Sequence, residues 1–375
     1  MNIAILSVSE KGKELSSKLK TLLDEDPTII KVSTFHKNVK NNINAIFNGN
    51  INYNINYDVI IGIMATGILI RSIADKIQDK TKDPAILSMD DNGKYVISLV
   101  SGHLGGANEL AKKIAKLLES EPVITTATDN ASKIGIDTLA TKLYWEIINK
   151  NQILAFNKAI LDEIPIKLYI NLLENNKIEY KNYIDNYLKN QEKNTLEVID
   201  VKNMNMSIEN IQSRILSSGD SGGNYNYTDY NAIACLNDHI MFFKPKKIVL
   251  GIGARAEISK EKVKNAIQIA MNNLNLSLDR VDYVATVELK KDEKGILDAL
   301  EEIDKPLEIV AIDEIKKFTS PEISNSEFVQ EKFNIPGVAE PVALIVAKRK
   351  SKGLSKLIHK KIAIDGVTVA VAVSK

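Results

Sequence analysis

Apolar runs that end in glycine and pass directly into an amphipathic helix recur along this chain. The densest example spans residues 99–109, where Leu99-Val100 leads into Ser-Gly-His-Leu-Gly-Gly-Ala-Asn-Glu. Residues 95–100 have the apolar character of a buried strand. Downstream, four apolar residues recur at helical spacing: Leu110, Ile114, Leu117 and Leu118. This alternation predicts an α/β protein.

The glycines of this turn permit two interpretations. Gly102, Gly105 and Gly106 allow positive φ and close approach of a ligand to the main chain, and the N–H groups at a helix start attract negative charge. The turn, with His103 just before the helix, therefore suits an anionic ligand or a developing oxyanion. The alternative is a tight glycine-rich connection with a satisfied histidine. The sequence alone leaves both open.

An apolar run that ends in glycine and is followed by a helix occurs twice more. Residues 58–64 form an apolar run before Thr66-Gly67, and we expect Arg71 in the first turn of the helix that follows. The helix dipole disfavours a cation there, which indicates a bound partner, although a solvated arginine is the alternative. Residues 247–253 run into a loop with Gly251 and Gly253, and Arg255 at its exit could hold an anion.

Three loops are expected near one edge of the first sheet, because ligands collect at the carboxyl ends of strands in open α/β sheets. They are Thr66-Gly67 with Arg71, residues 101–108, and residues 125–129. The turn at residues 90–93 predicts a hairpin that feeds the central glycine turn, and a second hairpin is predicted over Asp365-Gly366. For Thr125 and Thr126, strand propensity and helix capping are the alternative to ligand binding.

Composition excludes several classes of function. The 49 basic and 48 acidic side chains remove the net charge on which nonspecific nucleic-acid binding relies. One cysteine, Cys235, rules out an intrachain disulfide framework, and the four histidines lack metal-ligand spacing. No apolar run approaches the roughly 20 residues that span a bilayer, and the start lacks a basic n-region and a cleavage site. We therefore expect a cytoplasmic protein that binds neither nucleic acid nor membrane.

A chain of 375 residues should contain two or three domains. We expect N-terminal and C-terminal three-layer α/β domains at residues 1–140 and 246–375, joined by a variable middle region at residues 141–245. The middle is rich in tyrosine and asparagine, and its composition predicts a flexible loop near residues 217–229. His36 is interpreted as a surface residue.

Several stretches together resemble one family. They are Thr-Gly-Ile-Leu-Ile-Arg at 66–71, Lys-Asp-Pro-Ala at 82–85, residues 101–108, residues 125–129, Leu-Gly-Ile-Gly at 250–253, residues 288–295 and residues 337–344. No single block is decisive, but the ordered set covers both ends of the chain and is similar to the cobalt-precorrin-5A hydrolase (CbiG) family of anaerobic cobalamin biosynthesis. The family has an N-terminal domain, a variable middle and a C-terminal domain.

The resemblance implies an enzyme that opens the δ-lactone of cobalt-precorrin-5A and releases acetaldehyde, giving cobalt-precorrin-5B. It implies no cofactor of the protein's own, since cobalt is carried by the tetrapyrrole substrate. Homo-oligomers and contacts with neighbouring pathway enzymes stay open. One departure matters: family members commonly carry cysteine and a basic residue around the C-terminal glycine loop, whereas residues 253–256 here read Gly-Ala-Arg-Ala. A catalytic cysteine is excluded there, and Arg255 alone keeps the charge of the loop.

Lactone opening requires an activated water, a stabilised oxyanion and a proton for the leaving alkoxide. We hypothesise that His103 is the general base, because a helix N-terminus disfavours the imidazolium, and that Asp129 or Glu109 orients it. Glu340 is ambiguous between a helix-start carboxylate and an acid in the site. The residues assigned to substrate binding are Thr66, Gly67, Arg71, Ser101, Gly102, Gly105, Gly106, Asn108, Thr125, Thr126, Gly251, Gly253, Arg255 and Glu340.

Two other functions are weighed against this one. A non-catalytic corrinoid-binding or carrier protein would need the same binding surface without the chemistry. A nucleotide-binding regulator rests on glycine-rich loops alone, and the chain has neither a complete dinucleotide fingerprint nor a phosphate-binding P-loop.

Overall fold

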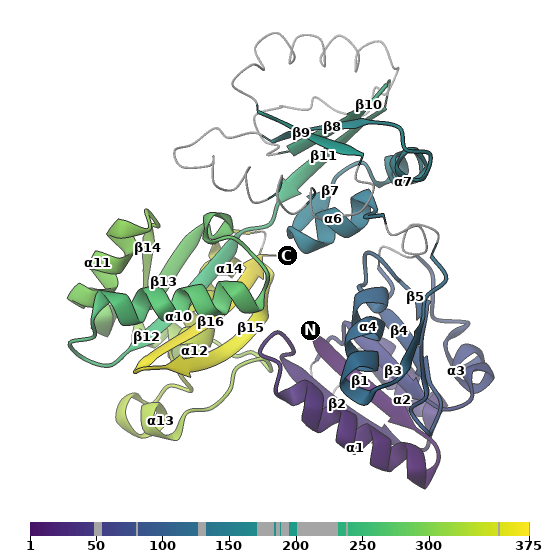
Figure 1. Cartoon of the computed structure of the whole chain (residues 1–375). Helices are drawn as coiled ribbons and strands as arrows, with labels where there is room; N and C mark the ends of the chain where they lie inside the picture. Colours follow the sequence, from purple (N-terminus) through teal and green to yellow (C-terminus); the bar gives the residue numbers. More distant parts are fainter. Residues whose placement is uncertain are drawn as a thin grey trace. The chain divides into compact units, whose positions relative to one another are not determined.

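The computed structural model describes residues 1–48, 55–79, 82–126, 133–170, 184, 188, 195–200, 232–237, 239–351 and 353–374. The chain divides into two compact units, Met1–Val123 with Lys247–Lys375, and Ile124–Lys246. Helices and sheets alternate along it, which confirms the α/β class (Figure 1). The predicted flexible loop near residues 217–229 lies outside the described residues.

The first sheet has the strand order β2-β1-β3-β4-β5-β6. Its strands are β1 (Asn2–Ser7), β2 (Lys31–His36), β3 (Val59–Ile63), β4 (Ala85–Met89), β5 (Tyr95–Val100) and β6 (Glu121–Val123). The helices around it are α1 (Glu10–Asp24), α2 (Val39–Phe47), α3 (Thr66–Ile73) and α4 (Ala107–Leu118). Strands β1 to β4 are parallel, and β1 lies between β2 and β3, so the winding reverses at β1.

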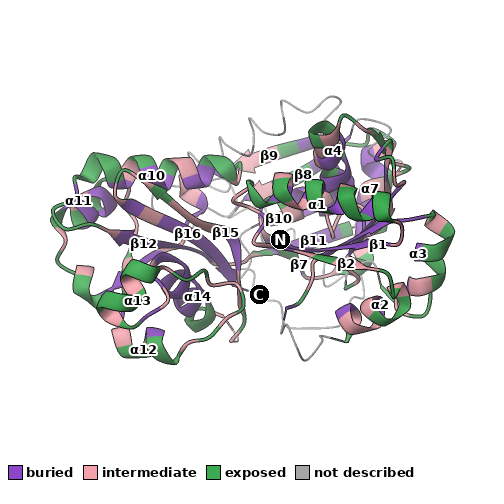
Figure 2. Cartoon of the chain, turned by 90° about the horizontal axis from the view of Figure 1, so that it is seen from below, coloured by how far each residue is buried: buried purple, intermediate pink, exposed green. Residues whose placement is uncertain are grey.

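Helices cover both faces of this sheet. Leu19 and Leu23 of α1 share one apolar cluster with Leu110 and Ile114 of α4. On the other face α2 and α3 contribute a second cluster, which includes Leu69. Figure 2 shows buried strands between helices whose outer faces are exposed. The N-terminal part therefore has the three layers expected from its strand-helix alternation.

The predicted hairpin at residues 90–93 is confirmed. Gly93 has φ 69° and its N–H donates to the carbonyl of Asp90 at 3.0 Å. The Asp90 carboxylate accepts from the N–H groups of Asn92 and Tyr95 at 3.1 and 2.8 Å. This turn makes β5 antiparallel to β4. Strand β6 is parallel to β5 and runs in the same reversed direction.

The second unit contains a sheet of order β7-β11-β10-β8-β9. Its strands are β7 (Trp145–Ile147), β8 (Ile166–Ile170), β9 (Leu196–Asp200), β10 (Ala232–Leu236) and β11 (His239–Pro245). The elements accompanying it are α6 (Ile136–Lys142), the 3-10 helix η1 (Lys150–Gln152) and α7 (Ile153–Leu161).

The C-terminal sheet has the order β14-β13-β12-β16-β15. Its strands are β12 (Ile248–Ala254), β13 (Tyr283–Val287), β14 (Leu307–Val310), β15 (Ser355–Ile364) and β16 (Val367–Ser374). Its helices are α10 (Lys260–Asn273), η4 (Leu278–Arg280), η5 (Glu288–Lys290), α11 (Lys294–Glu302), α12 (Ile312–Lys317), α13 (Glu327–Phe333) and α14 (Ala339–Arg349). The predicted hairpin over Asp365-Gly366 is confirmed, with φ of 49° and 90° at the two turn residues.

Gly251 and Gly253 lie inside β12, so the expected glycine loop after this strand is wrong. A β-carbon on Gly251 would lie 1.9 Å from the carbonyl oxygen of Ala339, the first residue of α14. A β-carbon on Gly253 would lie 2.6 Å from Thr368 Oγ1. The two glycines therefore let a helix and a neighbouring strand pack closely on β12, which no local pattern reveals.

Substituting Gly251 should destabilise the protein. Gly251→Ala forces the backbone of α14 away from β12, and overpacking of this kind typically costs about 1–3 kcal/mol. Gly337→Ala is the matched control, because the nearest atom to its β-carbon would be 3.7 Å away. Urea unfolding followed by circular dichroism measures both variants. Equal midpoints for the two variants would contradict the packing role.

His359 should make stability depend on pH. Its side chain is fully buried in β15, where Nδ1–H donates to the Lys360 carbonyl at 2.7 Å and Nε2 accepts from Asn273 at 3.1 Å. Burial lowers the pKa of His359 from 6.5 to about 4. The unfolded chain therefore binds the extra proton first as pH falls below 6.5, so stability is retained above pH 6.5 and lost towards pH 4.

The loss amounts to at most about 3 kcal/mol. Urea midpoints at pH 7.5 and pH 5 should differ less in His359→Gln than in the unmodified protein. The control is His239→Gln, which changes an exposed histidine. A pH dependence unchanged by His359→Gln would show that other groups cause it.

Candidate functional site

The reversed direction of β5 separates the predicted site residues onto two edges of the first sheet. We call the edge where β1 to β4 begin the amino edge, and the edge where they end the carboxyl edge. At the amino edge, Val100 pairs with Ile86 and Ser101 Oγ donates to the carbonyl of Asp83 at 3.0 Å. At the carboxyl edge, Thr66 Oγ1 lies 3.0 Å from Ser88 Oγ.

The expectation that three loops meet at one edge is therefore wrong. The glycine turn of residues 101–106 lies at the amino edge, and Thr66, Gly67 and Arg71 lie at the carboxyl edge, roughly 13–17 Å away along a five-residue strand. Strand β6 also ends at the amino edge, and the chain then enters the second unit with Thr125 and Thr126. Asp129 lies outside the described residues.

Two glycines of the amino-edge turn serve close internal packing. A β-carbon on Gly105 would lie 2.5 Å from the β-carbon of Ser101, and one on Gly102 would lie 2.7 Å from Asn108 Oδ1. Asn108 is buried and accepts from Ser98 Oγ at 2.7 Å. Gly106 differs: it has φ 82° and open space where a side chain would be. The turn is held by its own residues, and Gly106 is the one of these three glycines that faces open space.

The N–H groups at the start of α4 are less available to a ligand than the sequence suggests. The N–H groups of Ala107 and Asn108 donate to the carbonyls of Ser101 and Gly102 at 3.3 and 3.1 Å, so these two N–H groups are not available to an anion. His103 is half-buried, and its carbonyl accepts from Gly106 N–H at 3.0 Å. Glu109 is exposed and accepts from Lys112 at 3.3 Å. The assignment of unpaired N–H groups to the first positions of this helix is wrong, because the loop carbonyls fold back onto them.

Arg71 occupies the last turn of α3, not the first, because this helix ends at Ile73. Its side chain nevertheless runs back along the helix, as helical side chains do, so that a β-carbon on Gly67 would lie 3.3 Å from Arg71 Nη1. Arg71 is exposed and forms no ion pair with any described residue. Its guanidinium therefore brings to the first turn of α3 a positive charge that no described residue pairs with.

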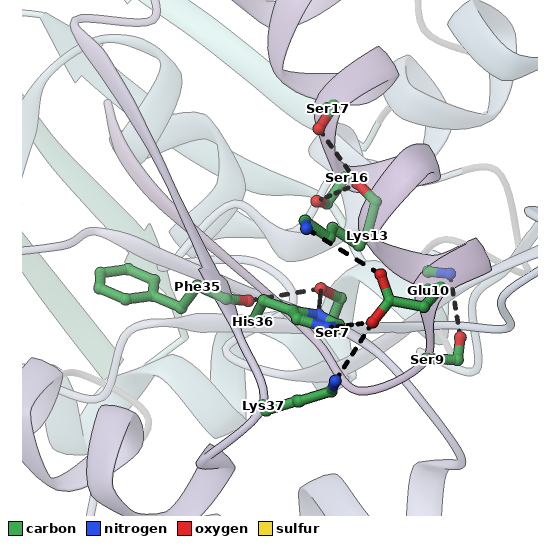
Figure 3. Close-up of polar contacts among 10 residues, drawn as sticks. Ser7, Ser9, Glu10, Lys13, Ser16, Ser17, Phe35, His36 and Lys37 are labelled. Atoms are coloured by element: carbon green, nitrogen blue, oxygen red, sulfur yellow. Dashed lines mark hydrogen bonds and ion pairs between the residues drawn. The ribbon is translucent and has the colours of Figure 1, made fainter.

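A hydrogen-bonded group that the sequence did not reveal lies at the ends of β1 and β2 (Figure 3). Ser7 Oγ lies 3.1 Å from His36 Nδ1, and His36 Nε2 lies 3.2 Å from Glu10 Oε1. Lys37 Nζ donates to the same Glu10 oxygen at 3.1 Å. The interpretation of His36 as a surface residue is too simple, since its side chain is 21% exposed and both ring nitrogens have partners. The group depends on the register that places Ser7 opposite His36, and this register exists only once β1 and β2 pair.

The two candidate side chains of the C-terminal part, Arg255 and Glu340, lie in different environments. Arg255 is exposed, and its N–H donates to the carbonyl of Gly366 at 3.0 Å. Glu340 is buried in the first turn of α14. Its carboxylate accepts from the N–H and hydroxyl of Ser324, both at 2.7 Å, and from Lys361 N–H at 3.0 Å. These contacts favour the structural role of Glu340, and its assignment to substrate binding stays a prediction.

An open cavity of about 630 Å³ lies where α10 and α11 begin. Residues 256–260 form one wall and residues 289–298 contribute the other. Its charges are mixed, because the lining includes both acidic and basic residues: Glu257, Asp292, Glu293, Asp298, Lys260 and Lys294. The sequence stretch 288–295 carried part of the family resemblance, yet no residue of this wall was assigned to a site.

Two features are absent from the described residues. No three histidine, cysteine or acidic side chains among them come together as ligands for a metal ion. Within the same residues, no helix has both the length and the apolar character needed to cross a membrane.

Comparisons with known families match both ends of the chain. The family described as Cobalamin synthesis G N-terminal matches residues 52–129, and Cobalamin synthesis G C-terminus matches residues 248–372. The first match includes the amino-edge turn and α3. The second includes β12 and both walls of the cavity.

Several relatives match along nearly the whole chain. A probable cobalt-precorrin-5A hydrolase of Methanocaldococcus jannaschii is 31% identical and covers 99% of both chains. The cobalt-precorrin-5A hydrolase of Priestia megaterium is 25% identical over 98% of this chain and 94% of the relative. A crystal structure of a cobalamin biosynthesis protein G homologue from Sulfolobus solfataricus has a TM-score of 0.57 and 26% identity, covering 100% of this chain and 97% of that one. The chain therefore belongs to the CbiG family of cobalamin biosynthesis.

Proposed function

We propose that this chain is a cobalt-precorrin-5A hydrolase, which opens the δ-lactone of its tetrapyrrole substrate and releases a two-carbon fragment as acetaldehyde. The observation that carries this proposal is the match to the Methanocaldococcus jannaschii hydrolase over 99% of both chains. This match includes both family modules. Cobalt belongs to the substrate in this reaction and is not a cofactor of the protein.

The amino-edge turn offers the chemistry for lactone opening. His103 acts as the general base: it takes a proton from a water whose oxygen attacks the lactone carbonyl carbon, and the protonated ring then returns this proton to the alkoxide that leaves as the lactone opens. Glu109, or Asp129 further along the chain, orients the imidazole. The Ala107 and Asn108 N–H groups are already paired, so stabilisation of the oxyanion comes from the remaining N–H groups of the turn or from the substrate.

Release of acetaldehyde breaks a carbon–carbon bond after the lactone has opened. The freed hydroxyl loses its proton as its carbon–oxygen bond becomes the aldehyde carbonyl. The electron pair of the broken carbon–carbon bond passes to the macrocycle, whose conjugated system accepts it. The protein then positions the substrate and excludes water, which itself contributes to the rate. Arg71 and Arg255 are exposed guanidinium groups without an ion pair to any described residue, and such groups suit the carboxylates of a tetrapyrrole.

Acetaldehyde release tests the function directly. Purified protein mixed with cobalt-precorrin-5A should form acetaldehyde in proportion to the substrate consumed, measured by coupling to alcohol dehydrogenase and NADH. Substrate binding without acetaldehyde, at protein concentrations up to that of the substrate, would identify the chain as a carrier.

Replacing His103 should remove most of the turnover. His103→Ala should lower kcat by roughly two to four orders of magnitude, the usual contribution of a general base. His239→Ala is the matched control, because that histidine is exposed and lies in the other unit. A normal kcat with a raised KM would show that His103 only contacts the substrate.

Replacing Arg71 should weaken binding without slowing the chemistry. Arg71 lies at the opposite edge of the sheet from His103, so Arg71→Ala should raise KM about tenfold, typical of one lost charge-assisted contact, and leave kcat within about twofold. Lys18→Ala removes the same charge from the exposed face of α1 and is the control. A fall in kcat larger than the rise in KM would contradict this separation of roles.

A further inference from the structure

The Glu10 carboxylate rests among the side chains of one histidine and two lysines at the carboxyl edge (Figure 3). Glu10 Oε1 lies 3.2 Å from His36 Nε2 and 3.1 Å from Lys37 Nζ, and Oε2 lies 3.9 Å from Lys13 Nζ. We call the three side chains of His36, Lys37 and Lys13 the carboxylate cradle. None of them belongs to the site residues assigned from the sequence.

The cradle is positioned by contacts that do not involve Glu10. A carboxylate only accepts hydrogen bonds, so His36 donates from Nε2 to Glu10, while its Nδ1 lies in hydrogen-bond contact with Ser7 Oγ at 3.1 Å. Ser7 is 1% exposed, which fixes the ring from the sheet side. The main-chain N–H of Lys37 donates to the Ser7 carbonyl at 2.8 Å. The His36 ring and the backbone of Lys37 are thus fixed to the end of β1.

The backbone that carries Lys37 is strained. Lys37 and Asn38 have φ of 62° and 44°, two consecutive non-glycine residues in the left-handed region. Such conformations cost free energy and persist where the surrounding structure imposes them, often beside a site that uses them. Here they turn the chain sharply after β2, at the sheet edge where open α/β folds bind ligands.

Glu10 itself is held loosely. Its side chain is 69% exposed, and exposed ion pairs contribute little to stability. Hydrogen bonds from Lys37 and His36 hold the pKa of Glu10 below its usual range, so the carboxylate is ionised at neutral pH. As the first residue of α1, it would keep a favourable position at the helix N-terminus after leaving the cradle. An external carboxylate can therefore replace it at small cost.

We propose that the cradle of His36, Lys37 and Lys13 is a binding site for a carboxylate group of an anionic ligand, and that Glu10 occupies it until the ligand displaces it. Resting on the proposed function, the ligand class is a polycarboxylate tetrapyrrole. The site lies at the opposite edge from His103, so it anchors a substituent and takes no part in the chemistry.

Removing Glu10 should tighten binding of such a ligand. The probe is uroporphyrin, a fluorescent octacarboxylate tetrapyrrole, titrated against the full chain. Glu10→Ala should lower its Kd about three- to tenfold, as expected for removal of one competing exposed charge. Glu14→Ala is the matched control, because it removes an exposed carboxylate one turn further along α1. Glu10→Gln removes the charge while keeping the size of the side chain.

A second experiment changes a residue of the cradle itself. In the Glu10→Ala background, Lys37→Ala should return the Kd to that of the unmodified protein or weaker. Equal Kd values for Glu10→Ala and Glu14→Ala would overturn the proposal, because overall charge would then explain the gain. Displacement of the probe by inorganic phosphate as efficiently as by propane-1,2,3-tricarboxylate would overturn the carboxylate assignment.

These outcomes are independent of acetaldehyde release. If the protein releases acetaldehyde but Glu10→Ala and Glu14→Ala bind the probe equally, only the cradle proposal fails. If the binding results are as expected but the protein releases no acetaldehyde, the cradle proposal stands and the proposed hydrolase function fails.

Discussion

The hairpin at Asp90–Gly93 determines at which edge of the N-terminal sheet the candidate site residues lie. The Asp90 carboxylate accepts two main-chain N–H bonds, and Gly93 supplies the left-handed residue that the turn requires. By reversing β5, the turn carries the glycine loop with His103 to the amino edge, whereas β1, β3 and β4 end at the other edge. A parallel β5 would have placed His103, Thr66 and Arg71 side by side. The antiparallel strand makes them two separate groups.

Glycine has different roles in loops that look alike in the sequence. Gly102 and Gly105 are needed because Asn108 and Ser101 occupy the space a side chain would take, and Gly251 because α14 packs against its strand. Gly106 has a left-handed backbone and open space beside it. Close approach of the main chain to a ligand is thus a credible use for one of the three glycines in the amino-edge turn. The other two preserve its shape, and with it the position of His103.

The separation of the two edges suits a large substrate with many carboxylates. Chemistry at one lactone requires few groups, and we propose that the amino-edge turn supplies them. Recognition of the carboxylates requires cations spread over a wider surface, such as Arg71 over Gly67 and the cradle around Glu10. In the cradle an internal carboxylate occupies the place proposed for the ligand. This arrangement keeps the charges compensated in the free protein and allows exchange without a large conformational change.

The sequence by itself determined the α/β class, the two hairpins at residues 90–93 and 365–366, and the ordered motifs that identify the family, because these depend on local periodicity, turn residues and residue order. It also indicated the positive charge at the start of α3, although it misplaced Arg71 by a turn. Only the tertiary structure decided which edge each loop occupies, that Glu340 is held by Ser324 and Lys361, and that Ser7, His36 and Glu10 meet. These facts follow from strand direction, register and helix packing. Such contacts join residues far apart in the chain, and no local pattern encodes them.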